Sequence, residues 1–167
     1  MIPFESIRSS IVRNLSKYLG IKVIELNVAA PMPEYPFLTY DFTDFGSSQG
    51  IAAEYRVGDT KQQKEIVTFT VSFLSYAETK AESIQYALRS KDWFHTLGHL
   101  LLKESMDVIV VDIGEITNRD VRIGVEWERR QGFEVEFRTT NLIDFPTGSE
   151  GTETIDKANI KEMDNIG

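Results

Sequence analysis

The chain has 167 residues, 41% of them apolar, and its 18 basic and 26 acidic residues give a net charge of −8. This length suits one globular domain, no apolar run approaches the about 18 residues of a membrane span, and the acidic balance argues against binding of nucleic acid. Cysteine is absent, which excludes disulfides, thiolate zinc sites and cysteine nucleophiles.

The first predicted element is a helix between Pro3 and Gly20. Apolar residues recur there every three or four positions, proline suits the first turn, and glycine suits the C-terminal cap. Because Glu5 and Arg8 interrupt the apolar residues, the stretch is not a secretory signal, and we expect an intracellular protein. A short β-prone run, Ile21–Leu26, follows.

The next stretch, APMPEYPFLTYDF, contains three of the chain's five prolines within six residues. Proline lacks the backbone donor that a central strand needs, so we expect residues 30–36 to form a stiff arm along an edge or across a surface of the sheet. The arm leads into a strand at Phe37–Phe42. We expect Met32 and Tyr35 to be exposed on it, facing a neighbouring subunit.

A hairpin is predicted between Ile51–Val57 and Glu65–Tyr76. The second of these stretches alternates apolar and polar residues, which is typical of a strand with one buried face. The polar insert DTKQQK, Asp59–Lys64, is expected to be its solvated tip. Asp59, Lys61 and Lys64 are therefore candidates for contact with identical neighbours or other partners.

A second helix begins at Thr79, which with Glu82 has the form of a capping box. Apolar residues continue with helical spacing through Phe94, Leu97 and Leu101. Gly98 is expected to end or bend this long helix.

Three strands are predicted after the second helix. Val108–Ile116 forms the first, Asn118–Asp120 a turn, and two alternating segments around Val121–Trp127 and Phe133–Phe137 form the others, with Gly132 punctuating the connection.

Two registers are open for the last strand pair. If Trp127 faces Phe133, like charges oppose each other, which is unfavourable in an isolated sheet, and this polar face would then be an interface with another subunit. A shift by two residues pairs Arg122 with Glu136 and leaves Glu128–Arg130 as the loop. Electrostatics favours the shifted register, and a solvent-exposed charged face is the alternative to an interface.

Taken together, these elements predict an α+β fold, with a mostly antiparallel mixed sheet of about five to six strands and two main helices on one face. Residues 1–145 form the domain. Residues 146–167 are polar and acidic and form a C-terminal tail or arm.

The two histidines, His95 and His99, are four residues apart on the second helix, as in a helical metal pair. A metal site needs a third ligand, and Asp92 is the one acid a turn away. The alternative is that both histidines lie on the solvent stripe of an amphipathic helix. Phosphate-loop, dinucleotide-binding and nucleophile-elbow motifs are absent from the sequence.

Trp127, Arg129 and Arg130 are expected at one tip of the sheet, where an aromatic residue with arginines is the usual composition of a binding hot spot. In an acidic chain, two adjacent arginines form a concentrated positive feature that could meet an acidic neighbour. The alternative is a core tryptophan beside solvated arginines.

Four stretches resemble, in their order, the phage neck or tail terminator proteins, which cap the tail tube of tailed phages and tail-like particles such as tail-like bacteriocins. They span about residues 31–137 and read PMPEYPFLTY, DWFHTLG, VVDIGEITNRD and EWERRQGF.

The resemblance implies a non-enzymatic structural protein without a cofactor. It implies a hexameric ring that stacks on the tail tube, ends tube polymerisation and joins a sheath, collar or head-connector protein, within a particle assembled in the bacterial host cytoplasm. An acidic lumen would repel the passing phosphate backbone. The family offers no contact residues to transfer, so the interface candidates are inferred from this sequence alone: Met32, Tyr35, Asp59, Lys61, Lys64, Arg119, Glu128, Arg129 and Arg130. The alternatives are a head-tail connector or stopper and, in a different class, a metal-dependent hydrolase that uses His95 and His99.

Overall fold

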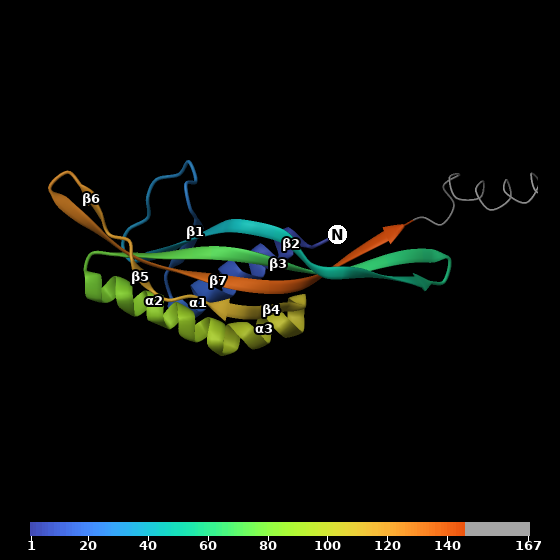
Figure 1. Ribbon diagram of the computed structural model, residues 1–167. Helices are drawn as coiled ribbons and strands as arrows, with labels where there is room; N and C mark the ends of the chain where they lie inside the picture. The colour runs from blue at the N-terminus through green and yellow to red at the C-terminus, as the bar shows by residue number, and fades with distance from the viewer. Residues whose placement is uncertain (146–167) are drawn as a thin grey trace, which may run out of the picture.

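The computed structural model describes residues 1–145 and places three helices on one face of a mixed sheet (Figure 1). The helices are α1 (Phe4–Leu19), α2 (Lys80–His95) and α3 (Leu97–Met106). The α+β class, the mostly antiparallel sheet and the helices on one face are therefore confirmed, with one helix more than predicted.

The described residues form a seven-stranded sheet with the central order β1-β2-β3-β7-β4. Only β1 and β2 run parallel, and β5 and β6 pair with the same edge of β7 as β4 does. The strands are β1 (Lys22–Glu25), β2 (Phe37–Val57), β3 (Thr60–Ala77), β4 (Val108–Ile113), β5 (Thr117–Asn118), β6 (Val121–Ile123) and β7 (Glu126–Phe145).

Helix α1 forms as its spacing predicts. The residues that recur at helical intervals, Ile7, Ile11, Leu15 and Leu19, are all buried against the sheet and the other helices. Gly20 ends the helix in the left-handed conformation, with φ of 72°, and its N–H donates to the carbonyl of Ser16. This is the C-terminal cap in which glycine costs least.

Helix α2 begins at the predicted cap, where the Thr79 hydroxyl accepts a hydrogen bond from the backbone N–H of Glu82 at 3.2 Å. The long helix then breaks at Thr96, not at Gly98 as predicted. Gly98 lies inside α3, and its missing side chain makes room for the ring of Trp93. The break also leaves Leu97 exposed, although its spacing predicted a core position.

Gly98→Ala is expected to destabilise the protein by about 1–3 kcal/mol through overpacking. A Cβ atom at this position would lie 2.6 Å from the Trp93 ring, which is itself 2% exposed and cannot move aside. The ordinary effect of Gly→Ala inside a helix is a gain of about 1 kcal/mol, so the expected sign is reversed.

Urea unfolding measures the effect of this substitution, with Leu100→Ala, at an exposed position of the same helix, as the control. A Gly98→Ala protein that is more stable than the parent contradicts the close packing.

The β2–β3 hairpin is longer than predicted because Phe37–Phe42 and Ile51–Val57 belong to one strand. Three irregularities in register interrupt β2, and glycines with positive φ, Gly46 and Gly50, lie near them. The predicted six-residue tip is wrong: the turn is only Gly58–Asp59, and Lys61–Lys64 already belong to β3.

Both predicted registers of the last strand pair are wrong. Residues 126–145 form one continuous strand, β7, so Trp127 and Phe133 do not face each other but lie in the same strand. The turn is Gly124–Val125, which pairs Arg122 with Trp127 and Ile123 with Glu126. The residues 128–130, predicted as a loop, are consequently part of β7.

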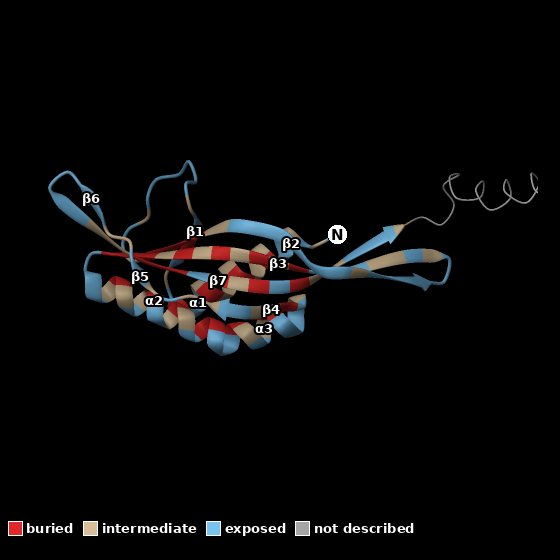
Figure 2. Cartoon of the chain, in the orientation of Figure 1, coloured by how far each residue is buried: buried red, intermediate tan, exposed pale blue. Residues whose placement is uncertain are grey.

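The core lies between the helices and the strand face that they cover. The side of β3 predicted to be apolar is almost fully buried and packs with the inward side of β7 and with Phe94 of α2 (Figure 2). Both ends of the sheet extend beyond the helices and are exposed on both faces. The core residues of these two strands are Val67, Phe69, Val71, Phe73, Phe133, Val135 and Phe137.

Candidate interaction surfaces

The proline-rich segment forms a loop that rises from the sheet on the side away from the helices and links the parallel strands β1 and β2 (Figure 1). The Tyr35 ring stacks on Phe37 with 5.7 Å between centroids, and Phe37 stacks on Tyr76 at 4.6 Å. The prolines lie between β1 and β2, so the prediction that they belong to no central strand is confirmed. We call residues 27–36 the proline arm.

Two residues at the start of β7 complete the attachment of the arm. The Arg130 guanidinium lies 5.1 Å from the centroid of the Tyr76 ring, and Arg130 also pairs with Glu128. The same carboxylate accepts a hydrogen bond from the Tyr35 hydroxyl at 3.1 Å. Tyr35, Phe37, Tyr76, Arg130 and Glu128 thus form a closed circuit, here called the arm clamp.

The arm clamp changes the ionisation of its tyrosine. Burial, together with the hydrogen bond to Glu128, raises the pKa of Tyr35 to about 12. The neutral phenol is therefore the form that donates to the carboxylate.

Asp120 fixes the strand that carries the arm clamp. Its carboxylate accepts hydrogen bonds at 2.9 Å from Arg129 Nη1 and from the backbone N–H of Arg130. Burial raises the pKa of Asp120, but these hydrogen bonds and the charge of Arg129 outweigh burial, so the pKa is lowered. Arg129 and Arg130 are each paired with an acidic side chain of the same chain, Asp120 and Glu128.

Asp120→Asn is expected to remove a part of the stability that depends on pH. Because the folded-state pKa lies below the ordinary 3.8, the carboxylate stabilises the fold above that pH, and the contribution is lost as pH falls through the depressed value. The difference in free energy of unfolding between parent and variant should therefore shrink on acidification, as denaturant titrations at pH 7 and near pH 3 would measure. A constant difference contradicts the assignment.

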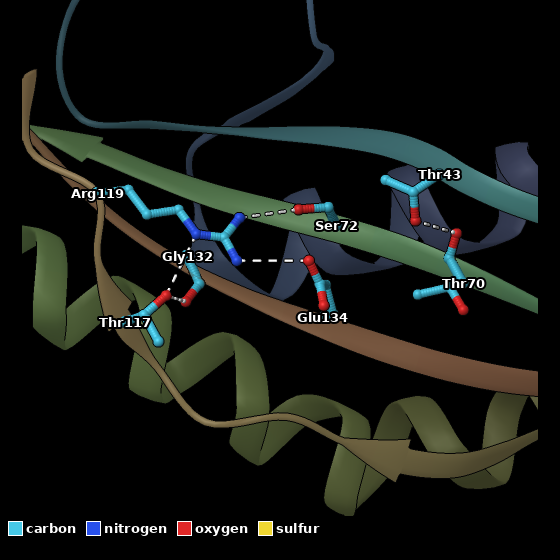
Figure 3. Close-up of polar contacts among 7 residues, drawn as sticks. All are labelled: Thr43, Thr70, Ser72, Thr117, Arg119, Gly132 and Glu134. Atoms are coloured by element: carbon cyan, nitrogen blue, oxygen red, sulfur yellow. Dashed lines mark hydrogen bonds and ion pairs between the residues drawn. The ribbon is translucent and has the colours of Figure 1, made fainter.

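Arg119 crosses the open face from β5 towards β3 (Figure 3). Its guanidinium donates to Ser72 at 3.2 Å, to Thr117 at 3.2 Å and to Glu134 at 3.5 Å. Gly132 lies directly beneath, and a Cβ there would be 2.7 Å from the Arg119 side chain. Gly132 therefore allows a close approach, and Arg119 links the segment after β5 to β3 and β7.

A hollow of about 710 Å³ lies between the proline arm, the sheet and the β6–β7 ribbon. Its walls are mainly apolar, and the arm clamp forms part of its floor. One polar atom in it has no partner: Thr39 is 4% exposed, and its hydroxyl makes no hydrogen bond with the described residues. The apolar residues that line the hollow include Ile24, Val28, Pro31, Met32, Phe37 and Ile123.

The opposite end of the sheet carries the other predicted candidates. Asp59 is in the turn, Lys61 pairs with Glu54 at 2.6 Å, and Lys64 pairs in register with Leu142 of β7. No described helix covers this end (Figure 1), which we call the distal ribbon, residues 49–66 with 139–145. Several of its large apolar side chains are exposed: Ile51, Tyr55, Val57, Ile66, Leu142 and Ile143.

His95 and His99 lie on either side of the break between α2 and α3 and line a shallow hollow with β4. Within residues 1–145 no group of three or more histidine, aspartate or glutamate side chains is placed to hold a metal ion. Asp92, the predicted third ligand, does not join them in such a group.

The predicted candidates therefore divide between two ends of the molecule. Met32, Glu128 and Arg130 line the hollow, and Tyr35 is joined to it through Glu128. Arg129 is next to Arg130 in β7 but pairs with Asp120, and Arg119 contacts Ser72 of β3. Asp59, Lys61 and Lys64 lie on the distal ribbon. Sequence reasoning missed Asp120 and Tyr76, and it left open whether Trp127 belongs to the core. Trp127 is 53% exposed, and Arg129 lies 5.9 Å from its ring centroid.

The sheet of this α+β subunit has uncovered apolar strands at both ends. Exposed apolar surface of this kind is typical of proteins that assemble with other proteins. None of its described helices has the length and apolar character needed to cross a membrane. A family model for the phage neck terminator protein matches residues 9–166, and the chain belongs to this family. No curated protein matches the chain. It is a structural protein of the phage neck, with a role in the joining of tail and head.

Proposed function

We propose that this protein caps the finished tail tube as a homo-oligomeric ring of six copies, ends tube polymerisation and presents the surface to which the head side joins. The observation that carries the proposal is the pair of uncovered apolar surfaces at opposite ends of the sheet. A subunit of a ring needs two such surfaces, one for each neighbour. The tail-tube protein and a sheath, collar or connector protein would be its further partners.

We further propose that the chain acts without a cofactor and is not an enzyme. It works in a virion or tail-like particle that is assembled in the host cytoplasm. Residues 1–145 are its one domain. The predicted acidic segment 146–167 lies outside the described residues.

Size-exclusion chromatography with light scattering and negative-stain imaging test the ring. We expect a hexamer, or a monomer that forms annuli when tail-tube protein is added and then blocks further growth of the tubes. Persistent monomers that leave tube growth unaffected would reject the proposal. A protein that binds the portal side and not the tube end would be a connector or stopper.

Replacement of Pro31 and Pro33 by serine is expected to weaken ring formation by about tenfold or more while the melting temperature changes little. Both prolines line the hollow on an exposed segment, so their main contribution is to stiffen the arm before it meets a partner. Light scattering over a concentration series measures assembly, and calorimetry measures the melting temperature. Pro3→Ser, at an exposed proline outside the arm, is the control. If the double proline variant has a lowered melting temperature but assembles normally, the arm contributes to the stability of the monomer and not to ring formation.

A further inference from the structure

The proline arm and β6, which border the hollow, lie at the opposite end of the elongated sheet from the distal ribbon (Figure 1). We propose that the hollow receives the turn end of the β2–β3 hairpin, residues 55–60, from a second copy of this chain. The inference rests on the proposed ring and names the contact that would close it.

The chemistry of the hollow suits an occupant that is mainly apolar. Its apolar walls come from the arm and from Ile24 and Ile123, and the charges of Glu128 and Arg130 neutralise each other inside the clamp. Lys22 and Glu25 also line the hollow, so it presents one further charge of each sign beside its apolar walls.

The turn end of the hairpin has the matching properties. Tyr55 and Val57 are 38% and 56% exposed, so they offer apolar surface without unfolding. The turn is made of two residues only, Gly58 and Asp59, which keeps the end narrow. The turn end carries one charge of each sign, Arg56 and Asp59, as the hollow does with Glu25 and Lys22.

A second copy is the occupant that these two surfaces indicate. They differ from each other, so contact between them is head to tail, and such contacts generate rings when the rotation closes. A two-fold dimer would instead bring like surfaces together. Each copy then gives its hairpin to one neighbour and its hollow to the other.

The natural absence of cysteine makes a clean test possible. Met32→Cys and Val57→Cys proteins are mixed and oxidised mildly, alone and on the ends of tail tubes, and the linked peptides are identified by mass spectrometry. We expect a 32–57 cross-link between copies, and a ladder of linked multimers when both substitutions are in one chain. Val111→Cys, at a valine of β4 that is 51% exposed, replaces Val57→Cys in the control.

A second variant tests the contact without cross-linking. Val57→Asp is expected to weaken assembly by about tenfold or more with an unchanged melting temperature, and Met32→Lys in the same chain should restore part of it. Val111→Asp is the control and should assemble normally.

The outcomes separate this inference from the proposed function. If rings form but the 32–57 cross-link is no more abundant than the control 32–111 cross-link, the proposed contact is wrong while the ring stands. Cross-linked open chains that neither close nor bind tubes support the contact but reject the capping ring. A protein that shows neither cross-links nor rings overturns both.

Discussion

Phe94→Ala is expected to lower the free energy of unfolding by about 3–5 kcal/mol. Phe94 is fully buried at the centre of an aromatic cluster, with ring centroids 5.0 Å from Phe73, 5.7 Å from Phe137 and 4.9 Å from Trp93. It is the residue through which α2 holds the two central strands. Phe133 lies further away, at 6.4 Å. The removal of the Phe94 ring leaves a cavity that these four neighbouring aromatic rings cannot fill by collapse.

Urea unfolding with a linear extrapolation measures this loss. Leu88→Ala is the matched control, because Leu88 is on the same helix and 51% exposed, and it should change stability by no more than about 0.5 kcal/mol. A domain has about 5–15 kcal/mol of stability in total, so this loss leaves a larger fraction of Phe94→Ala unfolded. The variant should therefore also assemble less well or not at all. Equal effects of the two substitutions contradict the packing of α2 on β3 and β7.

Glu128→Ala is expected to cost about 1.5–3 kcal/mol, the range for hydrogen bonds to charged groups. The Glu128 side chain is 7% exposed, and its removal leaves Arg130 and the Tyr35 hydroxyl without their shared partner. The arm then loses one of the two connections that hold it to the sheet, the stacking of Tyr35 on Phe37 being the other.

The Tyr35 pKa gives this prediction a second measurement. The folded-state pKa of about 12 lies above the ordinary 10.0, so the corresponding stability is present below pH 10 and is lost as pH rises through 12. In Glu128→Ala the pKa should fall towards the ordinary value, as ultraviolet absorbance titration of the tyrosines would show. Glu126→Ala, at an exposed position two residues earlier in β7, should leave the pKa unchanged.

Local patterns predicted the elements that depend on local physics. The helical spacing of α1, the cap at Thr79 and the alternation of β3 are each decided by neighbours within a few residues, and all three are confirmed. The helix break lies at Thr96, whereas the sequence favours Gly98, because glycine is commonly a helix breaker. In the structure Gly98 is a packing position, where the ring of Trp93 excludes a side chain.

The register of the last strands was missed for a different reason. Cross-strand charge pairing favours a register only where two strands face each other, whereas Gly124, with φ of 63°, makes the turn before Trp127. Glycine at the first turn position was the available signal for a tight hairpin there. Gly132, predicted to separate two strands, instead makes space for Arg119 inside one strand.

The candidate surfaces were predicted only in part. Tyr35 and Glu128 were both named, but they are 93 residues apart in sequence, and their contact depends on how β2, β3 and β7 align. The same holds for Asp120 with Arg129, since the pairing needs the β6–β7 turn. Residue types indicated which side chains make contacts, and only the topology shows with which partners.

The continuity of β7 has a mechanical consequence. One strand runs from Glu126, beside the hollow, to Phe145 in the distal ribbon, a length of about 65 Å for its 20 residues. It is hydrogen-bonded to β3 from Ala77–Arg129 to Lys61–Phe145. A pulling force between the two ends is therefore resisted by the covalent backbone of β7 and by its hydrogen bonds to β3, and no flexible loop lies between the ends. In a ring joined through these ends, each subunit would be a rigid connection between its two neighbours.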